Sequence, residues 1–138
     1  MSKQSGFTLV ELMVTVAVIG ILAAIASPSY AGYVFRSKIP VGLASLLAYQ
    51  ARMEQAYQDT GTYGSTACSA AIPSVANFEF TCSLAAGGQS FTAQVVGTNS
   101  LAGVSYSLDQ DGNHFTLAHP YGVPTTNCWT IRGGTCEI

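Results

Sequence analysis

An apolar run headed by a single carboxylate constrains this chain more than any other feature. Between Leu12 and Phe35 the sequence contains no aspartate, glutamate, lysine or arginine, and Glu11 stands directly before the run. As an α-helix, the stretch from Leu12 to Tyr33 is about 33 Å long, enough to cross a hydrocarbon core of about 30 Å. Acidic side chains are costly in a bilayer, so Glu11 requires a reason beyond membrane anchoring.

The rest of the chain has the composition of one weakly charged domain. Its 138 residues suffice for a single domain. Only 9% of them are charged, far below the quarter that is usual in soluble domains. The formal net charge is −2 and the five basic residues are scattered, so a basic patch for nucleic acid is not visible. A surface rich in serine, threonine, glycine, alanine and asparagine suits an extracellular protein that packs against copies of itself.

The cysteines indicate an oxidising compartment, because they are even in number and all follow the apolar run. They are Cys68, Cys82, Cys128 and Cys136. Pairing between sequence neighbours, 68–82 and 128–136, is favoured among the three possible connectivities, and each short loop would contribute roughly 2–3 kcal/mol. Free core cysteines are the alternative. A zinc site is disfavoured because no Cys-x-x-Cys pair exists and neither His114 nor His119 has ligand-like spacing to the cysteines, so we expect no metal and no cofactor.

The N-terminus does not have the pattern of an ordinary secretory signal. A cleavage near the small residues 23–27 remains an alternative on pattern alone. Against it stand Glu11, which a signal core should not contain, and the continuation of the apolar run through Tyr30 and Tyr33. These tyrosines fall where the aromatic belt of a membrane-spanning helix would lie.

The N-terminal sequence instead resembles that of type IV prepilins. The resemblance rests on Gly6-Phe7-Thr8-Leu9-Val10-Glu11-Leu12-Met13-Val14 and on Val18-Ile19-Gly20-Ile21-Leu22-Ala23-Ala24-Ile25-Ala26. It implies that residues 1–6 are a leader, which prepilin peptidase removes after Gly6. Phe7 would then become the N-methylated first residue, and Glu11 the fifth residue of the mature protein.

The resemblance also implies a role for Glu11 in assembly. In a filament, the Glu11 carboxylate would meet the amine of Phe7 from a neighbouring subunit, so that two buried charges pair. Between Gly20 and Pro28 the helix would either kink, as proline dictates, or unwind in the filament. The implied partners are further copies of the chain, other pilins, prepilin peptidase and the inner-membrane assembly machinery.

The expected fold is α+β, with the type IV pilin arrangement that the resemblance implies. A long helix over 7–57, transmembrane over about 12–33, would pack its second half on an antiparallel sheet of three or four strands within 58–138. That second half would bury a stripe made of Ile39, Leu43, Leu46, Leu47, Met53 and Tyr57. Pro40 and Gly42 are a weak point in this helix.

Alternating apolar residues predict strands at 78–82, 91–95, 104–108 and 114–117. The Asp-Gly sequence within 109–113 predicts a hairpin between the last two. The same five residues resemble the start of a calcium loop, but no acidic residue follows at the required distance. The 128–136 pair resembles the disulfide-bounded C-terminal loop of type IVa pilins, with Trp129 packing beneath that loop rather than serving as a ligand platform.

An enzyme is not expected, because the soluble half has two histidines, no clustered carboxylates and none of the common catalytic motifs. The leading hypothesis is a structural subunit of a type IV pilus for adhesion, twitching motility or DNA uptake. It would be a single-pass precursor in the inner membrane, with a periplasmic globular domain, and then part of an extracellular pilus. One alternative is a pseudopilin of type II secretion. Another is a minor pilin that binds DNA during natural transformation. A basic stripe would support it, and although the sequence shows none, folding could still bring Lys38, Arg52 and Arg132 together.

Overall fold

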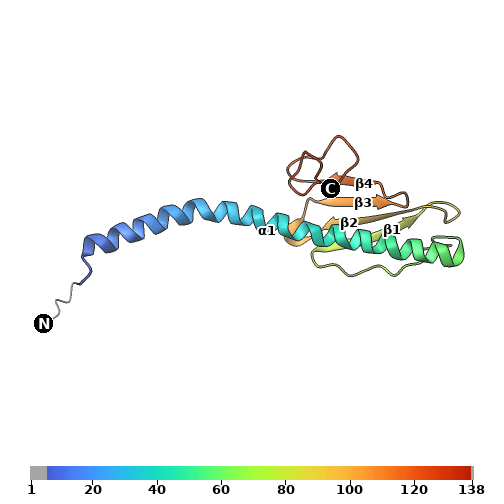
Figure 1. Cartoon of the computed structure of the whole chain (residues 1–138), viewed down its shortest axis with the longest axis horizontal. Helices are drawn as coiled ribbons and strands as arrows, with labels where there is room; N and C mark the ends of the chain where they lie inside the picture. The colour runs from blue at the N-terminus through green and yellow to red at the C-terminus, as the bar shows by residue number, and fades with distance from the viewer. Residues whose placement is uncertain (1–5, 138) are drawn as a thin grey trace. The chain divides into compact units, whose positions relative to one another are not determined.

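The computed structural model describes residues 6–137, apart from the side chains of residues 27–29. Helix α1 runs from Leu9 to Thr60, and the strands are β1 (Phe78–Leu84), β2 (Phe91–Gly97), β3 (Ser105–Asp109) and β4 (His114–Ala118), with the short 3₁₀ helix η1 (Asn99–Leu101) between β2 and β3. The strands form one antiparallel sheet in the order β1-β2-β3-β4 (Figure 1). The predicted α+β class is therefore confirmed.

The chain divides into two compact units, Met1–Val34 and Phe35–Ile138. In the first unit, the large apolar side chains from Phe7 to Ile25 are 49% to 83% exposed. By length and composition, α1 is long and apolar enough to cross a membrane. Its backbone is helical through both Gly20 and Pro28. The alternative of unwinding between them concerns the assembled filament and stays a prediction.

In the second unit, the rest of α1 buries one face against the sheet. The fully or nearly fully buried apolar side chains of this stretch are Ile39, Leu43, Leu46, Tyr49 and Met53. Two members of the predicted stripe differ. Leu47 is 44% exposed, because it lies about 100° around the helix from Leu46, and Tyr57 is only partly buried.

The weak point at Pro40 and Gly42 does not interrupt α1. Gly42 is buried, and a Cβ atom there would lie 2.7 Å from the ring of Phe78. The glycine therefore lets β1 approach the helix closely. The helix ends three residues later than predicted, where Gly61 adopts φ 75° and its N–H donates to the Tyr57 carbonyl at 2.7 Å, a common way of closing a helix.

The hairpin between β3 and β4 is confirmed, and the Asp109 side chain organises its turn. One carboxylate oxygen accepts from the N–H groups of Asp111 and Asn113 at 3.0 and 2.9 Å. The other accepts from the Asn113 side-chain amide at 2.8 Å, and Gly112 takes the left-handed conformation with φ 78°. The acidic turn residues thus have a structural role that accounts for their likeness to a calcium loop.

Two disulfides join the cysteines that are neighbours in sequence. Cys68 is bonded to Cys82, which ties the connection after α1 to β1, and Cys128 to Cys136, which closes the C-terminal loop. Trp129 is fully buried under that loop, as predicted. Its indole N–H donates to the Ser107 carbonyl at 3.0 Å, and its ring stacks on His114 with centroids 3.8 Å apart.

Candidate functional site

The predicted cleavage position lies just before the helix and is accessible. Gly6, Phe7 and Thr8 precede the first helical residue, Leu9. All three are exposed, Phe7 by 83%, and a Cβ atom built on Gly6 would meet no other atom within 4 Å. A peptidase requires an extended and exposed peptide bond, and the Gly6–Phe7 bond lies outside the helix. Residues 1–5 of the predicted leader, including Lys3, lie outside the described residues.

Glu11 has a partner within its own chain that the sequence reasoning missed. One of its carboxylate oxygens accepts from the Thr8 N–H at 2.9 Å and from the Thr8 hydroxyl at 2.7 Å. The Thr8 hydroxyl in turn accepts from the Glu11 N–H at 3.3 Å. This reciprocal arrangement is a capping box, and its signal is the spacing Thr-x-x-Glu before an apolar run. The carboxylate is therefore satisfied at the first turn of α1.

Three basic residues of the globular unit, Lys38, Arg52 and Arg132, bear on the DNA-binding alternative. Lys38 and Arg52 lie on the same helix, about 21 Å apart along its axis. Lys38 donates to the hydroxyl of Ser100 in η1 at 3.0 Å. Arg132 is 79% exposed and forms an ion pair with Glu137 at 3.3 Å. Folding therefore keeps Lys38 and Arg52 apart, and the charge of Arg132 is offset by Glu137, so the basic stripe that would support DNA binding is not formed by Lys38 and Arg52.

A groove lies between α1 and the connection that precedes β1. Its volume is about 290 Å³, and it is lined mainly by small or apolar residues, with Arg52 as its cation: Val41, Ser45, Ala48, Tyr49, Arg52, Pro73, Ser74, Val75 and Ala76. The Tyr49 hydroxyl donates to the Ala70 carbonyl at 3.0 Å, which holds this connection against the helix. The groove thus combines an apolar floor with one exposed guanidinium group.

Hydrogen bonds to the last residues hold the C-terminal loop. The Glu137 carboxylate accepts from the N–H groups of Ile131 and Arg132 at 2.6 and 2.9 Å. His119 is buried, with Nδ1 accepting from the Tyr121 N–H and Nε2 lying 3.2 Å from the Ile131 carbonyl. Burial lowers the pKa of His119 below its ordinary value, which favours the neutral ring that these contacts require.

The other perturbed groups are also explained by packing. Burial, together with a hydrogen bond from its hydroxyl to Glu54, raises the pKa of Tyr63 to about 12. Burial lowers the pKa of His114, which is stacked on Trp129. Within the part of the chain that the structure describes, no group of three or more histidine, cysteine, aspartate or glutamate residues is placed to hold a metal ion.

Two family models match the chain. Residues 1–27 match the prokaryotic N-terminal methylation motif. Residues 28–107, from the end of the apolar run into β3, match the model described as type IV minor pilin ComP, DNA uptake sequence receptor. This second match covers more than half of the sequence and includes Lys38, Arg52 and the groove.

Individual relatives agree with these matches. Fimbrial protein EcpC of Eikenella corrodens is 32% identical over 102 residues, which cover 74% of this chain and 67% of that protein. The type IV major fimbrial protein FimA of Dichelobacter nodosus is 47% identical over 58 residues, 42% of this chain but only 36% of its own length. A solved type IV pilin from Shewanella oneidensis aligns with 64% of this chain and 90% of its own, at 23% identity and a TM-score of 0.49. The family matches and EcpC together show that this chain is a type IV pilin and belongs to the family of the minor pilin ComP.

Proposed function

We propose that this pilin is made as a membrane-anchored precursor, cut between Gly6 and Phe7, methylated at the Phe7 amine and assembled into a pilus with its globular unit outside the membrane. The methylation motif over residues 1–27 supports the processing step. The exposed apolar side chains of the first unit support both a membrane-held and a filament-packed state, because either one removes them from water.

In the filament, the Glu11 carboxylate pairs with the amine of Phe7 from a neighbouring copy. The capping box supports this pairing because it fixes the position of the Glu11 carboxylate. The carboxylate is bonded to Thr8 at the first turn of α1, and Thr8 directly follows Phe7. An amine and a carboxylate that enter an apolar core together offset much of each other's desolvation cost. Glu11→Ala should leave membrane insertion intact and reduce sheared pili at least tenfold. Glu79→Ala, which removes an exposed carboxylate of β1, is the matched control, and normal piliation of the Glu11 variant would refute the pairing.

The finer role that we propose is DNA capture by a minor component of the pilus. A single observation carries it, the match of residues 28–107 to the model described as a DNA uptake sequence receptor. Arg52 is the exposed cation on the groove within the matched residues. A guanidinium group beside an apolar surface suits a phosphate with its adjoining sugar.

Fluorescence anisotropy of a labelled DNA duplex, with the full chain in detergent micelles, tests this role. Wild-type binding should weaken as salt rises, with a slope of about 0.9 for each phosphate contacted. Arg52→Ala should weaken binding about fivefold to tenfold and reduce the salt slope by about one. Arg132→Ala, outside the matched residues, should have little effect. Absence of duplex binding, or equal loss in both variants, would refute the role while leaving the pilus function standing.

A further inference from the structure

Two cations flank α1 where it enters the globular unit. Arg36 and Lys38 are both partly exposed, and being two residues apart they point about 200° away from each other around the helix. We call this pair the basic collar. Among residues 6–137, no carboxylate lies within ion-pair distance of either side chain, whereas Arg132 is paired with Glu137.

The collar is close to any bilayer that α1 crosses. Arg36 follows Tyr33, the end of the apolar run, by three residues, so the covalent chain keeps it within about 10 Å of that end. Beside the collar, the ring of Phe35 contacts the ring of Tyr121 at a centroid distance of 6.1 Å, and Tyr121 is 60% exposed. Exposed tyrosine next to lysine or arginine is the composition of a protein surface at the level of lipid headgroups.

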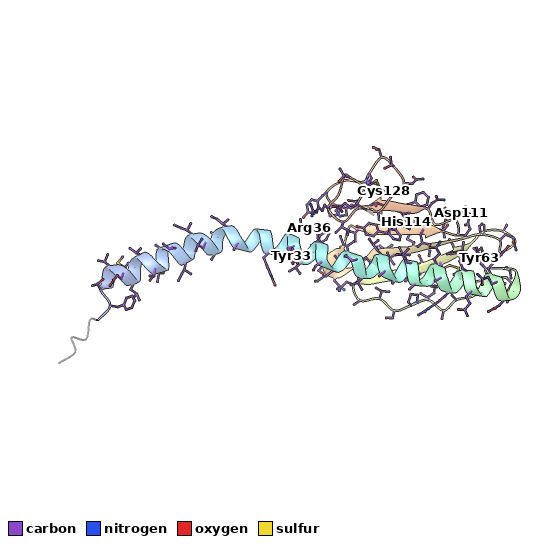
Figure 2. All side chains as sticks on the ribbon, viewed as in Figure 1. Tyr33, Arg36, Tyr63, Asp111, His114 and Cys128 are labelled. Atoms are coloured by element: carbon purple, nitrogen blue, oxygen red, sulfur yellow. A yellow bond between two sulfur atoms is a disulfide. The ribbon has the colours of Figure 1, made fainter. Side chains whose placement is uncertain are left out.

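The carboxylates of the unit are either paired or lie elsewhere. Glu137, in the C-terminal loop, forms an ion pair with Arg132. Asp109 and Asp111 occupy the β3–β4 turn, at the far end of the sheet from Arg36 (Figure 2). The Asp109 carbonyl accepts from Gln50, about 18 Å beyond Lys38 along α1, and Glu54 and Asp59 follow still later on the helix. The remaining carboxylate of the sheet, Glu79, is exposed between the buried residues Phe78 and Phe80 and so points away from α1. The end where α1 enters the unit therefore carries two cations, Arg36 and Lys38, while the Glu137 carboxylate of the C-terminal loop is paired with Arg132.

We propose that the basic collar binds the phosphate groups of anionic phospholipids around α1 while the subunit is stored in the bilayer. The proposal rests on the proposed membrane-held precursor with its globular unit outside. In that orientation, the general bias of lysine and arginine toward the inner side of a membrane disfavours cations just beyond the span, so their presence there requires a function. The side chains of Arg36 and Lys38 point to opposite sides of the helix, which suits lipid headgroups that surround it. A single straight DNA backbone could not contact both side chains at once.

Native mass spectrometry of the full chain in nanodiscs that hold equal amounts of phosphatidylglycerol and phosphatidylcholine tests the proposal. The wild type should retain the anionic lipid preferentially. Arg36→Gln with Lys38→Gln should lower the ratio of bound anionic to zwitterionic lipid about fivefold for each cation, about 25-fold for both. Arg52→Gln, farther along the same helix, is the matched control and should stay within about twofold of the wild type.

A charge-conserving variant separates loss of charge from loss of fold. Arg36→Lys with Lys38→Arg should keep the wild-type lipid ratio. The proposal is overturned if the wild type shows no preference, if the glutamine variant keeps it, or if Arg52→Gln loses it equally. It is also overturned if the collar variants reduce capture of a DNA duplex but not of lipid. Because lipid retention is measured on single subunits without pili or DNA, failure of the Glu11 or Arg52 experiments would leave that measurement unaffected.

Discussion

The two halves of α1 have opposite relations to the rest of the chain. From Phe7 to Ile25 every large apolar side chain is about half exposed or more. From Ile39 to Met53, one face of the same helix is buried to 3% exposure or less at Ile39, Leu43, Leu46, Tyr49 and Met53. The first half has its hydrophobic partners outside the subunit, in lipid or in other copies, and the second half has them inside. Helix α1 is therefore helical in both halves, but only its second half contributes to the stability of the globular unit.

The largest expected difference comes from making the same substitution in each half. Leu46→Ala removes a fully buried side chain from the core and should destabilise the globular unit by about 2–5 kcal/mol. Leu22→Ala removes a side chain that is 61% exposed and should leave the free energy of unfolding of the globular unit unchanged. Chemical denaturation of the full chain in micelles, followed by Trp129 fluorescence, measures both. Equal destabilisation would show that the halves unfold together.

The C-terminal disulfide should matter to the second half alone. Replacing Cys128 and Cys136 with serine opens a short loop. It should lower the free energy of unfolding by about 2–3 kcal/mol, because the unfolded chain gains conformational entropy. The same denaturation experiment measures the loss. The helical signal of the first half in micelles should not change, and a decrease there would contradict the separation of the two halves.

Protonation of histidine should also act on the globular unit alone, since both histidines lie in it. Burial lowers the pKa of His119, so its contribution to stability is present above the ordinary value near 6.5 and is lost as pH falls through the folded pKa. Protonation also removes the ring nitrogen that accepts from the Tyr121 N–H. The free energy of unfolding should therefore fall below about pH 6.5, and less so in His119→Asn. A titration of His119 by NMR at or above its ordinary pKa would contradict this.

The smallest effect is expected at the start of the first half. Thr8→Ala removes the cap that Glu11 shares and should destabilise the first turn by about 1 kcal/mol. Hydrogen exchange at the amides of the first turn should become faster in that variant, whereas Thr8→Ser keeps a hydroxyl and should behave like the wild type. Faster exchange throughout α1 would show that the cap supports more than its own turn.

Sequence patterns predicted most of the fold, and the departures have physical causes. The helix, four strands and hairpin follow from periodicity and turn residues, which act over a few neighbours. The stripe was wrong at Leu47, because Leu46 and Leu47 are adjacent and only their contacts with the sheet decide which is buried. Tyr49 was missed for the same reason, since its hydroxyl depends on the Ala70 carbonyl, far along the chain. Thr8 was predictable from its spacing to Glu11 but was overlooked.

The sequence by itself determined the apolar run, the carboxylate at its head and the prepilin motif, because these depend on residue type and on spacing along one segment. Only the tertiary structure decided how the charges are arranged. It bonded Lys38 to Ser100 of η1, paired Arg132 with Glu137, and placed Asp109 and Asp111 at the end of the sheet far from Arg36. Charges interact through space, so their grouping depends on which segments the fold brings together.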